Sequence, residues 1–473
     1  MTRFLISISN SAVSAILMVA LSWMLPPSAF GELTYARGVV LFGATSLFDW
    51  LSLSIIRYWV GETEGRENRR VTLEASMAGA VMLVPPLSFL AYALAPAQVS
   101  GPMLLAIAVH VAALGYVESR VAIARSTCDD RDLGMLILPR AAATLLFALG
   151  AVWAGAGAVG VVGALAAAQC AGVAYLVLAR RPFHLRAGFP EPAQAARFLR
   201  FGGASVLADA ALSGGALALA TLAIGTHGAS VYGAYALANE LLTRTVGAAG
   251  FALELALLPL ALTALVEQGR EAGRTTLSTN IGFSIAVLAP MLLGFYLVAP
   301  AFARLALSPD QRDMFVQLSG WVALQCVFTA GRQFILNQPL FAAERTAPAL
   351  WCVLAGVVAS VAAGVVLVPT HGALGIAWAQ TSGAGLTFAL QALVVWRVFP
   401  AGPPWRSLAR IGAACATMAL VLWPLRQELH GVTGLAAMVA LGAAAYGVAL
   451  WALDFQGLRK QKGLRALKLR TQA

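Results

Sequence analysis

The chain of 473 residues is 60% hydrophobic and 11% charged, and it carries a formal net charge of +11 at pH 7. Soluble domains contain roughly 25% charged residues, whereas the apolar runs here continue for about 20 residues, the length that crosses the hydrocarbon of a bilayer. The composition therefore excludes a water-soluble globule. Because the basic residues lie in short gaps between apolar runs, they are membrane-insertion signals and do not indicate nucleic-acid binding.

The apolar runs predict an all-α, polytopic transmembrane bundle of about 14 spans. In chain order, the first six lie at residues 4–25, 34–57, 73–95, 102–119, 136–154 and 158–179. The next six lie at residues 202–223, 230–258, 279–302, 314–341, 348–368 and 373–396, and the last two at 408–425 and 433–453. The first run is longer than the roughly 7 to 15 apolar residues of a signal peptide, so we expect it to be a span.

The longest internal polar segment contains Arg180, Arg181 and Arg186 and continues to Arg200. It marks the midpoint of the molecule. We therefore expect two lobes of six helices, with spans 1 to 6 in residues 1–190 and spans 7 to 12 in residues 191–400. Residues 401–473 then hold two additional spans and a basic cytoplasmic tail.

An internal repeat favours this division. Residues 30–36 (FGELTYA) match residues 232–238 (YGAYALA), and the pattern from Gly160 to Gln169 returns from Gly372 to Gln380. Each motif is weak alone, but the two offsets are similar, as expected for a body built from two related lobes.

The distribution of charge predicts the topology. If residue 1 is cytoplasmic, about 26 of the 32 Lys and Arg fall on the cytoplasmic side, and three, Arg304, Arg312 and Arg426, lie outside. The remaining three, Arg37, Arg244 and Arg332, fall within spans. This satisfies the positive-inside rule and predicts that both termini are cytoplasmic. The outer gaps are too short for a folded catalytic domain, so we expect no enzyme and no catalytic residues.

Metal, disulfide and cofactor sites are not expected. The five cysteines form no CxxC pair, and the five histidines are isolated from one another and from acidic residues at ligand spacing. These patterns lack the spacing of zinc sites and of disulfide frameworks.

Charged residues inside spans are costly, roughly 2.5 to 3.5 kcal/mol on insertion scales, so each should face a cavity or a partner. Glu240 and Arg244 lie four residues apart on one helix face, roughly 15 to 21 Å from the outer end of their span. They form either a neutralising ion pair or a site in which Arg244 binds a diphosphate and Glu240 holds it. Arg332 lies in a polar strip with Gln333 and Asn337, and we expect this strip to line a cavity.

The remaining charged candidates have weaker signals. Arg37 is one turn from the outer end of its predicted span, where it can extend to the interface, and Arg57 at the inner mouth can meet an incoming headgroup. Asp49, Asp209 and Glu254 are candidates for coupling to an ion or proton, or for structural pairs between helices. Arginine suits an anionic cargo because it stays charged and binds phosphate oxygens bidentately.

Four short motifs carry a family resemblance. They are residues 9–11 (SNS), residues 25–31 (LPPSAFG), residues 56–58 (IRY) and residues 341–346 (FAAERT) before a new span. With the layout of spans, they make the chain resemble the polysaccharide transporter family, the O-antigen and exopolysaccharide flippases, of the multidrug/oligosaccharidyl-lipid/polysaccharide flippase superfamily. The similarity of layout covers nearly the whole chain, but the motifs are degenerate.

The resemblance implies a flippase of the bacterial cytoplasmic membrane that acts by alternating access between two lobes. The implied substrate is an isoprenoid diphosphate-linked oligosaccharide for cell-surface polysaccharide, and membrane lipid, a polysaccharide polymerase and glycosyltransferases are the implied partners. A multidrug/cation antiporter and a lipid II flippase of the same superfamily remain alternatives. An alternative from another class is a membrane glycosyltransferase, polymerase or ligase. The lack of an outer domain and of catalytic acid pairs in the sequence argues against it.

Overall fold

The structure, a computed structural model, describes residues 2–59, 66–94, 100–127, 130–178, 190–342, 347–398, 405–426, 428 and 431–457. The basic segment 180–186, residues 343–346 of the FAAERT motif and the basic tail after residue 458 lie outside these ranges. The described residues are helical almost throughout, with no strand among them. This confirms the predicted all-α fold class.

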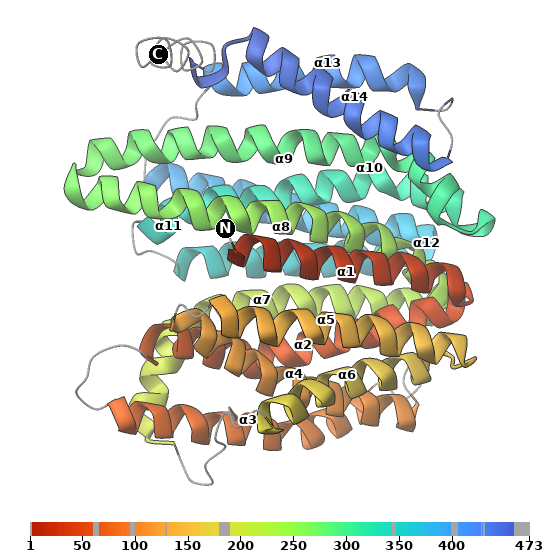
Figure 1. Ribbon diagram of the computed structural model, residues 1–473, viewed down its shortest axis with the longest axis vertical. Helices are drawn as coiled ribbons and strands as arrows, with labels where there is room; N and C mark the ends of the chain where they lie inside the picture. The colour runs from red at the N-terminus through yellow and green to blue at the C-terminus, as the bar shows by residue number, and fades with distance from the viewer. Residues whose placement is uncertain are drawn as a thin grey trace, which may run out of the picture. The chain divides into compact units, whose positions relative to one another are not determined.

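The helices follow the predicted spans in order (Figure 1). The first seven are α1 (Thr2–Met24), α2 (Pro27–Tyr58), α3 (Arg66–Leu94), α4 (Gly101–Ser126), α5 (Asp130–Trp153), α6 (Ala158–Leu178) and α7 (Pro192–His227). They are followed by α8 (Ala229–Glu267), α9 (Arg270–Ala306), α10 (Pro309–Gly331), the π-helical segment η1 (Arg332–Leu336) and α11 (Asn337–Ala342). The last are α12 (Ala347–Val398), α13 (Trp405–Leu425), α14 (Gly431–Ala452) and the short η2 (Phe455–Gly457).

Twelve helices of the described chain are long and apolar enough to cross a membrane. One of them, α12, is two helices joined at Gly372, whose φ of 55° and ψ of −125° break the helical path. The apolar stretch Ser9–Met24 of α1 is shorter than the other candidates. With α1 and both halves of α12 counted, the described residues hold the predicted fourteen spans.

Local sequence sets where several helices start. Proline stands in the first turn of α2, α4, α7 and α10, where its missing N–H removes no helical hydrogen bond. Ser100 caps α4, because its hydroxyl accepts a hydrogen bond of 3.4 Å from the backbone N–H of Met103.

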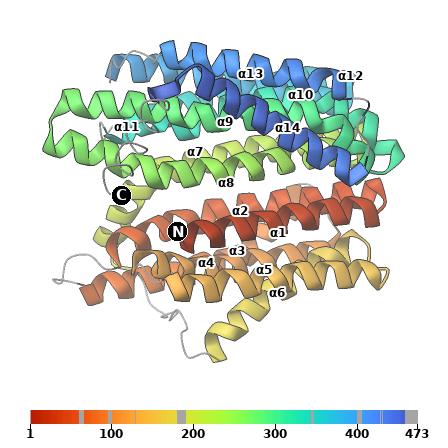
Figure 2. The same cartoon turned by 45° about the horizontal axis from the view of Figure 1, so that its top comes forward.

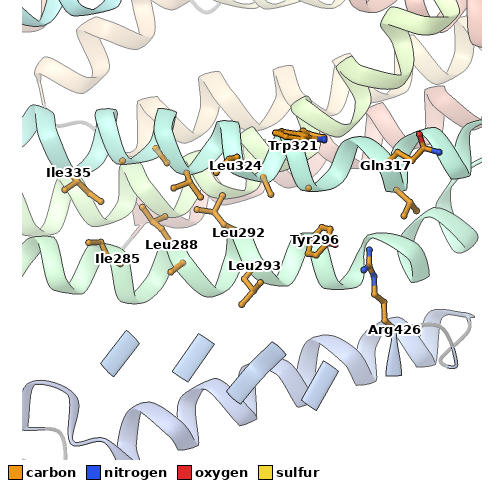
Figure 3. Close-up of a pocket in the computed structure, with 17 residues that line it drawn as sticks. Ile285, Leu288, Leu292, Leu293, Tyr296, Gln317, Trp321, Leu324, Ile335 and Arg426 are labelled. Atoms are coloured by element: carbon orange, nitrogen blue, oxygen red, sulfur yellow. The ribbon is translucent and has the colours of Figure 1, made fainter. Parts of the chain in front are cut away.

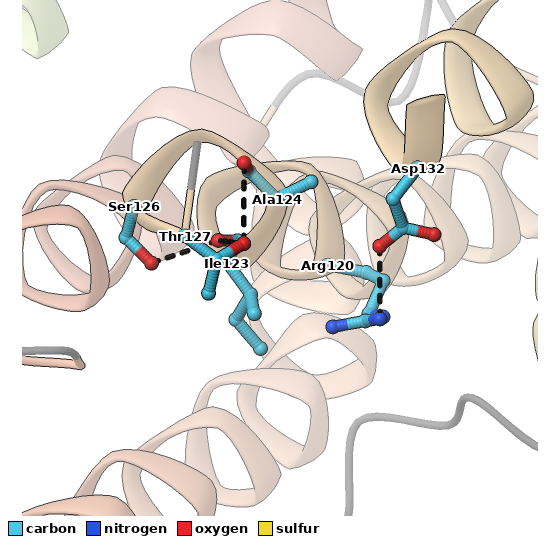
Figure 4. Close-up of polar contacts among 6 residues, drawn as sticks. All are labelled: Arg120, Ile123, Ala124, Ser126, Thr127 and Asp132. Carbon is cyan, nitrogen blue, oxygen red and sulfur yellow. Dashed lines mark hydrogen bonds and ion pairs between the residues drawn. The ribbon is translucent and has the colours of Figure 1, made fainter. Parts of the chain in front are cut away.

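The corner between α4 and α5 is closed by polar contacts (Figure 4). The hydroxyls of Ser126 and Thr127 donate to the carbonyl of Ile123 at 2.7 and 3.0 Å. The guanidinium of Arg120 forms an ion pair of 2.9 Å with Asp132 at the start of α5. These contacts satisfy the last carbonyls of α4 and join the two helices.

The described chain divides into two compact units. The first unit contains residues 1–241 and 346–387, and the second contains residues 242–345 and 388–473. Both α8 and α12 therefore contribute residues to each unit. The predicted lobes, with a boundary at 190, stay a prediction.

In the first unit, α2 packs against α4 and α7, and α4 packs against α6. In the second unit, α13 and α14 pack on each other and on α9, as both views show (Figures 1 and 2). Leu297 of α9, Met418 of α13 and Met438 of α14 are buried in the cluster between them. The hydroxyl of Tyr446 in α14 donates to the carbonyl of Ala286 in α9 at 2.6 Å. The two C-terminal spans are therefore attached to α9.

Candidate functional site

The internal repeat forms a close helix crossing in the first unit. A Cβ added at Gly31 of α2 would lie 1.8 Å from the carbonyl oxygen of Ala229 at the start of α8. One added at Gly233 of α8 would lie 3.1 Å from the Cα of Gly31. The two matching aromatic-Gly motifs thus meet each other, and glycine is required because the backbones approach so closely.

Two turns beyond this crossing, Arg37 and Glu240 form an ion pair. The guanidinium of Arg37 on α2 donates to the carboxylate of Glu240 on α8 at 3.1 Å, and the side chains are 25% and 28% exposed. Arg37 also contacts the sulfur of Met18 on α1. Nothing in the sequence pairs Arg37 with Glu240, and the structure brings them together.

Arg37 lies farther from the start of its helix than its predicted span implied. Because α2 begins at Pro27 and not near residue 34, Arg37 is about 15 Å along the helix from its first residue. Arg37 therefore pairs with Glu240 of α8, in place of the expected extension of its side chain to the membrane interface.

Further polar groups of the first unit were not singled out from the sequence. Arg140 of α5 forms an ion pair of 2.8 Å with Glu118 of α4. His110 of α4 is 8% exposed, and its buried Nδ1 has no hydrogen-bond partner among the described residues. It lies in electrostatic range of both Arg37 and Arg140. The sequence could have pointed to this group through Arg140, because it is a charged residue inside the predicted span 136–154.

The predicted ion-coupling residues separate into two groups. Asp49 of α2 accepts a hydrogen bond from the hydroxyl of Thr45 and lies in electrostatic range of Asp209 and Glu118. Asp209 on α7 is exposed, and Asp49 is half-buried. Glu254, also half-buried, belongs to α8 in the second unit. The structure thus brings Asp49 and Asp209 together, within one unit.

Arg57 lies in the last turn of α2, where its side chain is exposed. The next residue, Tyr58, packs its ring against Phe198 of α7 at 5.3 Å, and the guanidinium of Arg197 lies 5.2 Å from the Tyr58 ring centroid. The predicted inner mouth therefore carries basic and aromatic side chains together.

In the second unit, Arg332 and Asn337 flank the π-helical segment. Arg332 is its first residue, and Asn337 follows it, with its side-chain oxygen accepting a hydrogen bond of 2.6 Å from Gln391 of α12. Arg244 lies on the part of α8 that belongs to the same unit, and both arginine side chains are half-buried. Such π-helical segments occur frequently at functional sites.

Aromatic packing fixes this segment. Phe334 is buried and lies against Gly250 of α8, where an added Cβ would come within 2.2 Å of its ring. Its ring centroid is 5.2 Å from that of Phe251, and Phe388 of α12 fills the space beside Gly331. The backbone of Arg332 is therefore held between α8 and α12.

The described residues contain no group of three or more His, Cys, Asp or Glu side chains arranged to hold a metal ion. The sites that the structure does define are ion pairs and amide hydrogen bonds among long apolar helices. They suit recognition of a polar or anionic group within a membrane.

No known protein family profile matches the chain, and no curated protein matches it by sequence. Solved structures do match its fold. The inward closed conformation of the lipid II flippase MurJ is similar with a TM-score of 0.72 at 9% identity, covering 96% of this chain and 99% of that one. An inward-facing multidrug resistance MATE family transporter of the MOP superfamily is similar with a TM-score of 0.56 at 15% identity, covering 81% and 98%. The eukaryotic MATE transporter AtDTX14 gives 0.54 at 14% identity, covering 87% and 97%.

The chain is a multi-pass membrane protein whose described residues are helical almost throughout. More particularly, it has the fold shared by the MurJ flippase and the MATE transporters of the MOP superfamily.

Proposed function

We propose that this protein is a flippase that carries an isoprenoid diphosphate-linked oligosaccharide across the bacterial cytoplasmic membrane for cell-surface polysaccharide synthesis. The observation that carries the proposal is the presence of half-buried arginines within the spans of a bundle whose fold matches a lipid II flippase over 96% of the chain. The proposed mechanism is alternating access, with both termini cytoplasmic.

The chemistry of the diphosphate supports arginine as the binding group. Arg244 and Arg332 lie in one unit on helices joined by the packing of Phe334 against Gly250. Two guanidinium groups can bind several phosphate oxygens in bidentate fashion. Asn337, held by Gln391, offers its amide N–H to the same headgroup or to the first sugar. Arg57 at the inner mouth is proposed to meet the incoming headgroup.

Reconstitution tests the proposal directly. The purified protein is placed in vesicles with a defined undecaprenyl diphosphate oligosaccharide, and an impermeant glycosidase outside reports the saccharide that reaches the outer leaflet. We expect protein-dependent exposure of the saccharide over the rate in empty vesicles. Equal rates in both kinds of vesicle would refute transport of this cargo.

A lipid II flippase is the second candidate, because the fold likeness is to the structure named as MurJ. Lipid II in the same vesicles separates the two: faster exposure of lipid II than of the oligosaccharide would favour this alternative. A MATE-like antiporter is less well supported, because the two MATE structures described above cover 81% and 87% of this chain. Export of a cationic dye by the vesicles would favour it, and transfer of a sugar to an acceptor would favour a glycosyltransferase.

The Arg37–Glu240 pair gives the first prediction. Glu240→Gln should slow transport by about tenfold, since a charge-assisted bond that positions Arg37 contributes about 1.5 kcal/mol. The exchanged pair Arg37→Glu with Glu240→Arg should fold normally, as judged by thermal unfolding, but should not restore transport in the vesicle assay. Full transport by the exchanged pair would show that only the neutralisation of charge matters and that Arg37 does not meet the cargo.

The proposed coupling role of Asp49 gives the second. Asp49→Asn keeps the side-chain size and removes the charge that lies in range of Asp209 and Glu118. We expect transport of the variant to lose its response to imposed proton and sodium gradients, while exchange without a gradient continues. Glu271→Gln, an exposed acid in the first turn of α9, is the matched control and should respond as the unchanged protein does. A gradient response preserved in Asp49→Asn would remove Asp49 from the coupling mechanism.

A further inference from the structure

A cavity of about 780 Å³ lies between α9 and α10 in the second unit. Its walls are apolar side chains, with Leu288 and Leu292 on α9 facing Leu324 on α10 (Figure 3). Several lining side chains of α10 are open to the surroundings, with Trp321 40%, Leu324 40% and Val327 42% exposed. In a membrane, such a surface contacts lipid chains.

One end of this cavity is positively charged. Arg426, which follows α13, is the one charged residue among the 17 that line the cavity, and it points toward Tyr296 of α9 (Figure 3). Its guanidinium carbon lies 4.5 Å from the Tyr296 ring centroid and 5.4 Å from that of Trp423. These rings hold the guanidinium by cation–π contacts. The N–H groups of the guanidinium still need hydrogen-bond acceptors.

A second arginine supports the same end. Arg304 of α9 donates to the backbone carbonyl of Arg426 at 3.1 Å. The Nε atoms of both residues are buried without a hydrogen-bond partner in the described part of the chain. Asp313, an acid in the first turns of α10, is exposed and does not line the cavity. Because unsatisfied buried donors are costly, this end is suited to an anion.

The dimensions fit one chain of a lipid. From Tyr296 near the charged end to Ile285 at the other, α9 rises about 17 Å at 1.5 Å per residue. One leaflet contributes about half of the roughly 30 Å of hydrocarbon. Arg304 and Arg426 are also two of the three basic residues that the charge distribution assigns to the outer side. Tyr296, Trp321 and Trp423 add aromatic side chains of the kind found at the membrane interface.

We infer that this cavity is a binding site for an anionic phospholipid of the outer leaflet, with its phosphate at Arg426 and one acyl chain between α9 and α10. Neither Arg244 nor Arg332 lines the cavity, although Gly331 and Ile335 beside Arg332 do. The proposed lipid site does not depend on the identity of the cargo. A single guanidinium suits a phosphodiester headgroup. Since α13 and α14 pack on α9, the lipid would brace the C-terminal spans against α10.

Native mass spectrometry of the purified protein with phosphatidylglycerol or phosphatidylcholine tests this site. We expect the unchanged protein to retain phosphatidylglycerol in preference to phosphatidylcholine. Arg426→Gln should weaken phosphatidylglycerol binding about tenfold, the effect of losing a charge-assisted hydrogen bond, and Arg426→Lys should weaken it less. Leu324→Trp, which fills the cavity and keeps Arg426, should weaken the binding of both lipids. Arg406→Gln, an exposed arginine at the other end of α13, is the matched control and should change nothing.

Three results would overturn the inference. The first is equal retention of phosphatidylglycerol and phosphatidylcholine, which would show chain contact without headgroup recognition. The second is unchanged phosphatidylglycerol binding in both Arg426→Gln and Leu324→Trp. The third is displacement of bound phosphatidylglycerol by equimolar undecaprenyl diphosphate oligosaccharide, which would assign the cavity to the cargo. Absence of transport by the unchanged protein, together with normal phosphatidylglycerol binding, would contradict the proposed function and leave this site intact.

Discussion

Arg244→Ala or Arg332→Ala is expected to abolish export of surface polysaccharide without lowering the amount of protein in the membrane. Each guanidinium is half-buried within the second unit, in a helix that the sequence predicts to span the membrane. A hydrogen bond to a charged group contributes about 1.5 to 3 kcal/mol. Loss of a bidentate contact should therefore slow transport of the lipid-linked oligosaccharide by more than about 100-fold. Initial rates in reconstituted vesicles, with protein measured by immunoblot, provide the readout.

The control for this prediction is Arg397→Ala. Arg397 is an exposed arginine in the last turn of α12 and should transport at the normal rate when replaced. Lysine at position 244 or 332 keeps the charge but not the bidentate geometry, so an intermediate rate is expected. Retained export in both alanine variants would refute the diphosphate-binding role.

Gly31→Ala should destabilise the first unit and stop transport. The added methyl group would lie 1.8 Å from the carbonyl oxygen and 2.3 Å from the carbonyl carbon of Ala229, and neither backbone atom can rotate away. Overpacking of this kind costs about 1 to 3 kcal/mol. Separation of α2 from α8 would also pull Arg37 away from Glu240. The expected observation is a lower midpoint of thermal unfolding in detergent, together with loss of transport in vesicles.

Gly163→Ala is the matched control, since it comes from the second repeated motif. A Cβ at Gly163 would meet nothing within 4 Å, and alanine in a helix is favoured over glycine by roughly 0.5 to 1 kcal/mol. The midpoint of thermal unfolding of Gly163→Ala should therefore stay constant or rise. Gly233→Ala, with a nearest contact of 3.1 Å, should give an intermediate loss. A normal midpoint for Gly31→Ala would mean that this crossing is looser than the structure shows.

Hydropathy predicted the number and order of the spans because hydrocarbon requires long apolar helices with internally satisfied backbones. It did not predict where helices end. The helix α2 begins at Pro27, and α7 extends from Pro192 to His227, well beyond the predicted span 202–223. Polar helical turns outside the hydrocarbon carry no hydropathy signal, so only start signals such as Pro192 mark them.

The candidate charges were predictable one at a time, but their partners were not. The apolar context identified Arg37 and Glu240, whereas their ion pair depends on the crossing of two helices about 200 residues apart in the chain. Glu118 was missed because it stands close to the end of a predicted span, where a charge is ordinary, whereas Arg140 lies inside its predicted span and was overlooked. His110 was set aside since no ligand-like neighbour precedes or follows it, although its electrostatic neighbours, Arg37 and Arg140, come from other helices.

The π-helical segment at Arg332–Leu336 has a consequence for sequence comparison. A wide turn takes in one residue more than an α-helix needs for the same rise. A related chain with an uninterrupted helix here should therefore be one residue shorter between Gly331 and Asn337. Deleting one residue from the segment would therefore restore a regular α-helix and leave the residues after it on the same helix face. The side chain of Asn337 would then keep its contact with Gln391, so alignments of this region should place their gap inside the segment, not in the adjoining loops.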